Sequence, residues 1–322
     1  MYKVLITNAV PQDVLQPLAG IAEIIQGPAG GDLMSRETVL RYVPKLHGII
    51  NQAELRVDEA LLDAAPQLKI VANVAIGVDN LDLDLMEQRG VWATNVPDAF
   101  VASTADCTLA HLLNLTRRIN AADRYVRSAQ WLNDGFQPGI WDGMLLAGKT
   151  LGIIGYGRIG KAVAQRARAF DMRVIYHNRT PSADEGYRTL DDLLTEADVI
   201  TLHTPLTSST HHLIDGARLA QMKPGAFLIN MSRGAVVHEE ALVDALLDGK
   251  LAGAALDVFE FEPEVHPALL RMSNVCLTPH IGGGTRESRW AARRLCAENI
   301  AAVLQGKAPI TPVNNPGNRC AD

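Results

Sequence analysis

The sequence predicts an α/β protein made of two domains, each built around a parallel sheet. Short apolar runs rich in β-branched residues alternate with segments of helical periodicity, which is the pattern of strands joined by helical crossovers. The length of 322 residues is too great for one ordinary domain of this class and comfortable for two. A glycine motif at 155–160 lies between such a run and such a helix, and the second half starts just before it.

The first half of the chain, up to about residue 99, alternates strand and helix patterns. Strands are expected at 2–7, 21–25, 47–51, 68–74 and 91–95, and helices at 12–19, after the N-cap candidate Ser35, and at 58–64. Ligands of open parallel sheets bind beyond the carboxyl ends of strands. Two loops are therefore candidates: Asn51-Gln52-Ala53, and residues 75–80, where a glycine can expose consecutive N–H groups to an anion. A plain turn is the alternative for each.

A long helix is expected from Ser103 to Ile119. Its apolar residues cover much of its circumference, which predicts burial between domains or between subunits. Residues 120–147, with Trp131, Phe136 and several glycines, are expected to form an irregular arm.

The second half alternates in the same way and ends in a long helix. Strands are expected at 151–154, 172–176, 197–203, 226–230, 253–257 and 275–278, and helices after residue 158, at 239–248 and at 286–304. The last helix can fold back on the first half, and the tail from Gly317 is expected to fray. The predicted domains are residues 1–99 with 287–322, and residues 100–286, the latter including the helix and arm at about 100–147.

The motif at 155–160 has the spacing G-x-G-x-x-G. Gly155 allows a tight turn, Gly157 allows backbone to approach a pyrophosphate, and Gly160 allows close packing of helix and strand. The N-terminus of the following helix offers free N–H groups and partial positive charge to phosphates. The motif between strand and helix predicts dinucleotide binding, with a structural turn as the alternative.

The end of the next strand predicts which dinucleotide is bound. An acidic residue there would bind the ribose 2′-hydroxyl of NAD. The sequence instead reads His177-Asn178-Arg179-Thr180, in which Arg179 could pair with a 2′-phosphate and its neighbours could donate to it. We expect NADP(H) to be preferred, with NAD(H) possible. The alternative is that Arg179 is an ordinary solvated charge.

Three charged side chains follow successive strands of the second half. Arg233 follows the strand at 226–230, Glu262 the strand at 253–257, and His280 the strand at 275–278. A cation polarises a carbonyl and holds a carboxylate, a histidine supplies a proton near neutrality, and a carboxylate stabilises the imidazolium. Singly, His280 could be a core residue, Glu262 a turn cap and Arg233 a surface ion-pair member. Together at one sheet edge they predict catalysis of hydride transfer.

Composition excludes several classes of protein. The net charge of −6 argues against nucleic acid or an anionic membrane as the main partner. No apolar run approaches the length of a membrane span, and the first residues read as a strand without a signal-peptide layout. The cysteines, including Cys320, have no zinc-type spacing, so no metal is predicted. A reducing, cytoplasmic location is expected.

These motifs resemble, in order and over nearly the whole length, those of the D-isomer-specific 2-hydroxyacid dehydrogenase family. The resemblance rests on Gly-Tyr-Gly-Arg-Ile-Gly at 155–160, Thr-Pro-Leu at 204–206, Met-Lys-Pro-Gly at 222–225, Asn-Met-Ser-Arg-Gly at 230–234, Asp-Val-Phe-Glu-Phe-Glu-Pro at 257–263 and Thr-Pro-His-Ile-Gly-Gly-Gly-Thr at 278–285. The Tyr-His-Asn-Arg-Thr run and Gly-Val-Asp-Asn at 77–80 are similar to the glyoxylate/hydroxypyruvate reductase branch, which includes 2-ketogluconate reductases. Met231 and Ala129 depart from residues usual in the family.

The resemblance implies two Rossmann-like or flavodoxin-like domains with the active site in the cleft between them, the first domain binding substrate. It implies that His280 donates the proton in reduction, that Glu262 is its partner and that Arg233 binds the substrate carboxylate and carbonyl. It also implies that Gly77 and Val78 give N–H groups to that carboxylate, that Asp257 holds the nicotinamide carboxamide, and that the protein is a homodimer built on the long helix and arm.

The predicted site is therefore the following. Cofactor contacts are expected from Thr104, Gly155, Tyr156, Gly157, Arg158, Ile159, Gly160, His177, Asn178, Arg179, Thr180, Thr204, Pro205, Thr210, Met231, Ser232, Arg233, Asp257, His280, Gly282 and Gly283. Substrate contacts are expected from Asn51, Gln52, Gly77, Val78, Arg233 and His280. The expected substrate is glyoxylate, hydroxypyruvate or 2-ketogluconate, reduced to the D-2-hydroxy acid. The alternatives are a phosphoglycerate, formate or phosphite dehydrogenase, or a non-catalytic dinucleotide-sensing protein.

Overall fold

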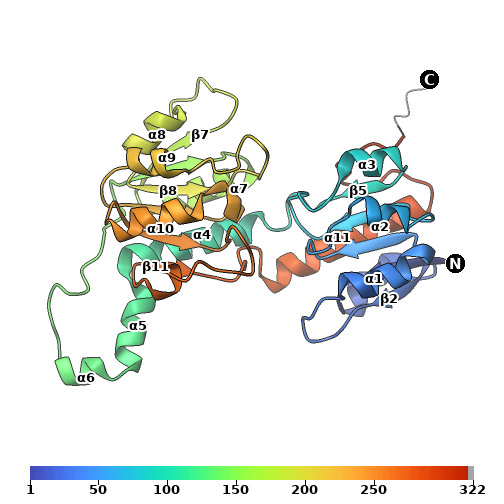
Figure 1. The fold of residues 1–322 in the computed structure, drawn as a ribbon, viewed down its shortest axis with the longest axis horizontal. Coiled ribbons are helices and arrows are strands. Elements are labelled where there is room, and N and C mark those ends of the chain that lie inside the picture. Colours follow the sequence, from blue (N-terminus) through green and yellow to red (C-terminus); the bar gives the residue numbers. More distant parts are fainter. Residues whose placement is uncertain (318–322) are drawn as a thin grey trace. The chain divides into compact units, whose positions relative to one another are not determined.

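Two parallel sheets organise the chain, one in each of two units. The computed structural model describes residues 1–317, so Cys320 and the tail beyond Gly317 lie outside the described residues. The first unit comprises Met1–Phe100 and the chain from Thr285 onward, and the second comprises Val101–Gly284 (Figure 1). Among the described residues, none forms a helix long and apolar enough to cross a bilayer.

The first unit has a five-stranded parallel sheet in the order β2-β1-β3-β4-β5. This is the flavodoxin-like order of doubly wound sheets. The strands are β1 (Tyr2–Ile6), β2 (Ala22–Gln26), β3 (Gly48–Asn51), β4 (Ile70–Asn73) and β5 (Trp92–Thr94). The helices are α1 (Arg36–Tyr42), α2 (Glu59–Asp63), α3 (Leu83–Gln88) and α11 (Arg286–Leu304), with 3-10 turns η1 (Gln12–Leu18) and η2 (Val43–Lys45).

Side chains alternate between the two faces of this sheet and create two cores. Val4 and Ile6 of β1 belong to the cluster that includes α11 and η1. Leu5, between them, belongs to the cluster that includes α1, α2 and α3. Successive side chains of a strand point to opposite faces, so the near-continuous apolar run of β1 reflects a strand covered on both sides.

Most predicted elements of the first unit are present, with two differences. Ser35 caps α1 by accepting from the N–H of Thr38, as predicted, and Asp58 caps α2 by accepting from Leu61. The segment predicted as a helix at 12–19 is a 3-10 helix with Pro17 inside it, because proline removes an N–H and disfavours the α-helix. Helix α3 was not predicted. Its N-cap Asp82 accepts from Leu85.

The second unit has a six-stranded parallel sheet in the order β11-β10-β9-β8-β6-β7. The strands are β6 (Thr150–Ile154), β7 (Arg173–His177), β8 (Val199–Leu202), β9 (Ala226–Asn230), β10 (Leu251–Leu256) and β11 (Val275–Leu277). Tyr187 forms an isolated parallel bridge with Tyr176 of β7. If this bridge is counted as a short strand beside β7, the strand order is that of the Rossmann fold. The direction in which successive strands are added then reverses between β6 and β8, and this is the switch point.

Helices cover both faces of the second sheet. Helices α8 (Leu190–Glu196), α9 (Gly216–Gln221) and α10 (Glu239–Leu247) belong to one core, with the short turns η3 (Gly234–Val236) and η4 (Leu269–Arg271) in the loops. Helices α4 (Val101–Arg117) and α7 (Arg158–Arg168) belong to the other. Gly152 of β6 permits the close packing of α8 on the sheet, because a Cβ there would lie 2.7 Å from the Leu193 side chain and 2.9 Å from Ala197.

The arm after α4 is more helical than predicted. Helix α4 ends at Arg117 because Arg118 takes a left-handed conformation, with φ of 53°. The chain then forms α5 (Ile119–Arg127) and α6 (Gln130–Asp134), which project from the sheet of the second unit (Figure 1). The expectation of an irregular segment throughout 120–147 was wrong. Aromatic residues and glycines in this range indicated loops, although the chain forms the short helices α5 and α6.

Candidate functional site

The glycine motif lies at the switch point of the second sheet, between the carboxyl ends of β6 and β8. Gly155 has φ of +96°, and a Cβ there would lie 2.6 Å from the backbone of His203. A Cβ on Gly160 would lie 2.3 Å from the Gly155 carbonyl oxygen, whereas a Cβ on Gly157 would meet nothing within 4 Å. Two glycines therefore permit close packing, and the third leaves open space before the N-terminus of α7. This cradle fits a pyrophosphate.

A hydrogen bond joins this loop to the end of β7. The Tyr156 N–H donates to Asn178 Oδ1 over 2.7 Å. The Tyr156 ring also stacks on Tyr176 with centroids 3.9 Å apart. The two predicted cofactor loops are thus fixed side by side, which places Arg179 next to the glycine loop.

The structure divides the run from His177 to Thr180 into anchoring and exposed residues. His177 Nδ1 lies 3.1 Å from the carbonyl oxygen of Arg188, and Asn178 accepts from Tyr156, so both hold the loop. Arg179 and Thr180 are exposed. A cation and a hydroxyl are therefore presented to solvent at the position where the predicted 2′-phosphate contact would form.

Asn230, the last residue of β9, shapes the loop that carries Arg233. Its Oδ1 accepts from the N–H and hydroxyl of Ser232, at 3.1 and 2.9 Å, and its Nδ2 donates to the Arg233 carbonyl over 2.9 Å. The Arg233 guanidinium donates to the Ser232 carbonyl over 3.0 Å. The side chain of Asn230 therefore replaces strand hydrogen bonds where the chain turns away.

Asp257 organises the loop that carries His280. The Asp257 carboxylate is 2 % exposed. Its Oδ1 accepts from the Thr278 hydroxyl at 2.6 Å and the Ile281 N–H at 2.8 Å, and its Oδ2 accepts from the Gly282 N–H at 2.7 Å. A carboxylate has about four acceptor sites, so Oδ2 retains one for a further donor, such as the amide that the resemblance implies.

Glu262 and His280 meet at this sheet edge. His280 Nδ1 lies 3.1 Å from Glu262 Oε2, and the other carboxylate oxygen accepts from the Phe259 N–H over 3.0 Å. The side chain of His280 is half exposed, so its second ring nitrogen is open to a ligand. The predicted partnership of these two residues therefore has the required hydrogen bond.

Arg233 joins the pair through tight packing of two loops. A Cβ on Gly234 would lie 1.8 Å from the Phe259 carbonyl carbon, so only glycine permits this approach. Burial raises the pKa of Glu262, but hydrogen bonds from His280 and the Phe259 N–H, with the positive charges of His280 and Arg233, outweigh it and hold the pKa below its usual range. Glu262 is thus ionised at neutral pH.

The remaining predicted cofactor residues lie around the same edge. Thr204 and Pro205 follow β8, and the Thr210 hydroxyl donates to the Pro205 carbonyl over 2.7 Å, which closes the turn between them. Gly282 packs against Asp257, Met231 and Thr104 so closely that a Cβ would lie 2.9 to 3.6 Å from their atoms. Thr104, Met231 and Ser232 are buried, whereas Arg158, Ile159 and Gly283 are more accessible.

In the first unit, the side chain of Asn51 shapes the loop after β3. This side chain is fully buried. Its Oδ1 accepts from the N–H groups of Ala53 and Leu55, and its Nδ2 donates to the Leu55 carbonyl. A substrate contact of Asn51 stays a prediction, and its side-chain amide already serves the loop.

The neighbouring Gln52 and the loop after β4 keep free donors. Gln52 Oε1 accepts from Arg293 over 3.2 Å, whereas its Nε2 is buried and has no hydrogen-bond partner among the described residues. Asn73 and Asn95 bind the carbonyls of Gly77 and Ile76. The carbonyls of Gly77 and Ile76 are thus fixed by hydrogen bonds. Within residues 1–317, the N–H groups of Gly77 and Val78 donate to no acceptor. The loop is thus suited to an anion.

Sequence reasoning missed a buried polar chain behind Asp257. His111 of α4 is 3 % exposed, with Nε2 3.1 Å from the Thr278 hydroxyl and Nδ1 3.3 Å from Cys276 Sγ. Burial lowers the pKa of His111, although the charge of Asp257 opposes this. A histidine directly before Leu112 and Leu113, among the apolar positions of the helix, was the available signal, because buried polar groups usually have partners.

Comparisons with known proteins agree with this arrangement. Residues 109–282 match the family described as "D-isomer specific 2-hydroxyacid dehydrogenase, NAD binding domain". A glyoxylate reductase of Thermococcus onnurineus is 42% identical over 97% of this chain and 96% of that protein. A glyoxylate reductase of Pyrococcus furiosus is 40% identical over 97% of this chain and 95% of that protein.

Solved structures give the same likeness. The TT0316 protein of Thermus thermophilus superposes with a TM-score of 0.91, at 41% identity over 97% of this chain and 99% of that one. An NADPH-dependent glyoxylate/hydroxypyruvate reductase of Sinorhizobium meliloti, in complex with NADP and malonate, superposes with a TM-score of 0.85, at 34% identity over 97% and 96%.

Proposed function

Since the chain belongs to the D-isomer-specific 2-hydroxyacid dehydrogenases, and is therefore an NAD(P)-dependent dehydrogenase, we propose that it is an NADP(H)-preferring glyoxylate/hydroxypyruvate reductase. It would reduce glyoxylate, hydroxypyruvate or 2-ketogluconate to the D-2-hydroxy acid. The relatives named glyoxylate reductase support the reaction class. The choice of cofactor and keto acid is the finer part of the proposal.

The observation that carries the proposal is the 3.1 Å contact between His280 and Glu262 at the sheet edge that also carries Arg233. Glu262 orients the His280 ring through this contact, and a positioned imidazole can act as a general acid. A protein that only sensed the dinucleotide would have no need of this pair.

In the proposed mechanism, a nicotinamide dinucleotide held at the glycine cradle would supply the hydride that the carbonyl carbon of the keto acid accepts. His280 gives its proton to the alkoxide oxygen that forms. Glu262 holds the imidazole through Nδ1 and stabilises its positive charge. Arg233 binds the substrate carboxylate and offsets the negative charge that develops on the carbonyl oxygen.

In the first unit, the proposed anion-binding loop is Gly77-Val78, with Gln52 as a further donor. The N–H groups of Gly77 and Val78 would bind the carboxylate of the keto acid. The buried Nε2 of Gln52 supports this role, because an unpaired buried donor costs about 1–3 kcal/mol unless something binds it.

The cofactor preference rests on Arg179. Its exposed guanidinium lies next to the loop that Asn178 fastens to Tyr156, where it would pair with a 2′-phosphate. We expect Arg179→Ala to lower kcat/KM with NADPH about tenfold or more, the value of one charge-assisted contact, and to leave kcat/KM with NADH nearly unchanged. Equal losses with both cofactors would contradict the preference.

The experiment that tests the function measures cofactor oxidation by the purified protein. NADPH and NADH are offered separately with glyoxylate, hydroxypyruvate, pyruvate and 2-ketogluconate. Turnover mainly with NADPH supports the proposal, and the best keto acid identifies the substrate. Turnover mainly with NADH would keep the reductase and overturn the role of Arg179. Tight cofactor binding without turnover would favour a dinucleotide-sensing protein.

We also propose that the protein is a homodimer that uses the arm. Helices α5 and α6 and the segment after them expose large apolar side chains that a monomer would leave in water. These are Ile119, Val126, Trp131, Leu132, Phe136, Ile140 and Leu145.

A further inference from the structure

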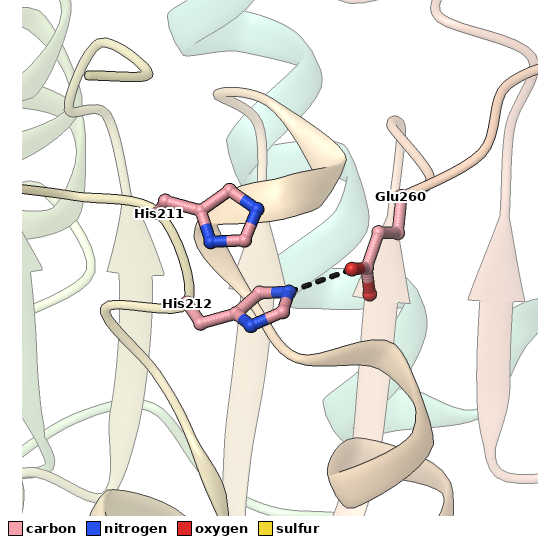
Figure 2. A group of neighbouring side chains, drawn as sticks. All are labelled: His211, His212 and Glu260. Atoms are coloured by element: carbon pink, nitrogen blue, oxygen red, sulfur yellow. Dashed lines mark hydrogen bonds and ion pairs between the residues drawn. The ribbon is translucent and has the colours of Figure 1, made fainter. Parts of the chain in front are cut away.

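Two adjacent histidines and a glutamate that are not part of the His280–Glu262 pair lie close together. His211 and His212 lie in the loop between β8 and α9, and Glu260 follows β10 (Figure 2). One ligating atom from each residue can be chosen so that all three lie within 4.8 Å of one another. Within the part of the chain that the structure describes, this is the one group of three or more histidine, cysteine or acidic residues with such spacing.

The three side chains form a compact set. His212 Nε2 lies 2.6 Å from Glu260 Oε1. The rings of His211 and His212 have centroids 3.9 Å apart and are tilted by 37°. Figure 2 shows the two tilted rings one above the other, with the Glu260 carboxylate beside them and bonded to His212. One ligating atom of each side chain thus lies near those of the other two.

The backbones that carry these side chains are fixed to one another. The His212 N–H donates to the Ala235 carbonyl over 2.8 Å, which joins the histidine loop to the segment before α10. Glu239, the first residue of α10, is in turn joined to Glu260 by two hydrogen bonds. The Glu239 N–H donates to Glu260 Oε2 over 3.0 Å, and the Glu260 N–H donates to Glu239 Oε2 over 3.1 Å. The cluster is therefore held in place before any ligand arrives.

The simplest alternative is that His212 and Glu260 only tie two loops together. That hydrogen bond needs one histidine, and it leaves the adjacent and exposed His211 ring without a purpose. Two histidines with one glutamate form a ligand set that zinc sites use, with a fourth position left to water.

We propose that His211, His212 and Glu260 bind a divalent transition-metal ion such as Zn²⁺. This inference does not depend on the proposed reductase activity. It departs from the sequence-based expectation of no metal, which considered only the spacing of the cysteines and of histidines near them.

The ion would replace the hydrogen atom between His212 and Glu260. Metal–ligand distances of about 2.0–2.2 Å at tetrahedral angles place two ligand atoms about 3.3 Å apart. The 2.6 Å separation of His212 Nε2 and Glu260 Oε1 must therefore widen by less than about 1 Å. Glu260 Oε2 keeps its hydrogen bond from the Glu239 N–H, which would orient the ligating carboxylate as outer partners do in metal sites.

The test measures metal binding by the full chain after treatment with a chelator, without substrate or cofactor. Co²⁺ is titrated while its visible absorption is recorded, and Zn²⁺ is titrated in competition with a coloured chelator. The buffer is kept slightly above neutral pH, because protons compete with a metal ion for its ligands. We expect one Co²⁺ per chain with the intense spectrum of a four- or five-coordinate ion, displaced by Zn²⁺.

Variants locate the ion. His211→Ala and Glu260→Gln should each weaken binding of Zn²⁺ by about tenfold or more. His211→Ala should leave the far-UV circular dichroism and NADPH binding unchanged, because the His211 side chain is exposed. Glu260→Gln keeps the size of the side chain but removes its charge and one acceptor oxygen, so it tests the carboxylate if His211→Ala perturbs folding.

Two controls address other histidine–carboxylate pairs. His266 Nε2 lies 3.1 Å from Glu240 Oε2 without a second histidine, and His280 pairs with Glu262. His266→Ala and His280→Ala should both retain the site. The proposal would be overturned by absence of a bound equivalent in the parent, by undiminished binding in both His211→Ala and Glu260→Gln, or by loss of the equivalent in either control.

Discussion

Each proposed catalytic side chain is positioned by a residue that takes no part in the proposed reaction. Asn230 turns the backbone that presents Arg233, and Asp257 binds both sides of the loop that presents His280. The Phe259 N–H holds the oxygen of Glu262 that does not face His280. Since misplacement of a catalytic group by about 1 Å can cost two orders of magnitude in rate, these partners matter to activity as much as to folding.

At the residue scale, the first prediction concerns His280. We expect His280→Ala to lower kcat for keto-acid reduction by about 100-fold or more, the usual contribution of a general acid. NADPH affinity, measured by fluorescence titration, should stay within about threefold, since His280 is half exposed and the glycine cradle lies elsewhere. An unchanged kcat would contradict its role as proton donor.

The second residue-scale prediction concerns the stability that depends on His203. Burial lowers the pKa of His203 to about 3, so the folded state holds its ring neutral. The unfolded chain binds a proton below about pH 6.5. The free energy of unfolding should therefore fall as pH drops from about 6.5 towards 3, with about 2 kcal/mol from this residue already lost at about pH 5.

Urea unfolding at neutral pH and at about pH 5 checks this prediction, with His203→Gln as the matched variant. Other groups titrate in the same range, so the comparison is between the two proteins. The parent should lose more stability than His203→Gln between the two pH values. An equal loss would show that His203 is not the group responsible.

At the scale of elements, the decisive contact lies between the loop after β9 and the loop after β10. Gly234 lies against the backbone of Phe259 and Glu260, so the approach of the loops is set by the absence of a side chain. The loop after β9 carries Arg233, and the loop after β10 carries both Glu262 and the proposed metal ligand Glu260. One glycine thus determines the spacing of two sites.

Gly234→Ala should therefore destabilise the protein by about 3 kcal/mol or more, because overpacking against backbone cannot be relieved by a rotamer change. The urea midpoint should fall and kcat should fall with it. Gly216→Ala is the control, since its new Cβ would meet only Ala241 at an ordinary 3.7 Å. Similar midpoints for the two variants would contradict this account of Gly234.

The sequence predicted those elements whose patterns are long or sharply bounded. The limits of β9 and α11 agree with the predicted 226–230 and 286–304. The short helices α3, α8 and α9 were missed, because one or two turns show too little periodicity. Arg233, Glu262 and His280 could be proposed from the sequence because each follows a strand. The hydrogen bonds of the buried Asn51 amide and the His212–Glu260 contact were not predicted, because both depend on side-chain geometry that spacing does not encode.

At the scale of the whole molecule, the arm predicts self-association. We expect the parent to sediment as a dimer in analytical ultracentrifugation. A double variant, Leu132→Glu with Phe136→Glu, should shift it towards monomer, since both side chains are more than four-fifths exposed and charges there would oppose burial. Leu270→Glu, exposed outside the arm, should remain dimeric. A monomeric parent would contradict the proposal.

The first unit is assembled from both ends of the chain, with α11 in the same core as β1 and η1. This arrangement has a consequence for synthesis on the ribosome. The strands of its sheet are made before α11, so the face that holds Val4, Ile6 and Ile50 has only η1 as cover until α11 has been synthesised. The second unit is continuous in sequence and can complete its core earlier. The nascent chain therefore carries a partly uncovered apolar sheet face until α11 has been made.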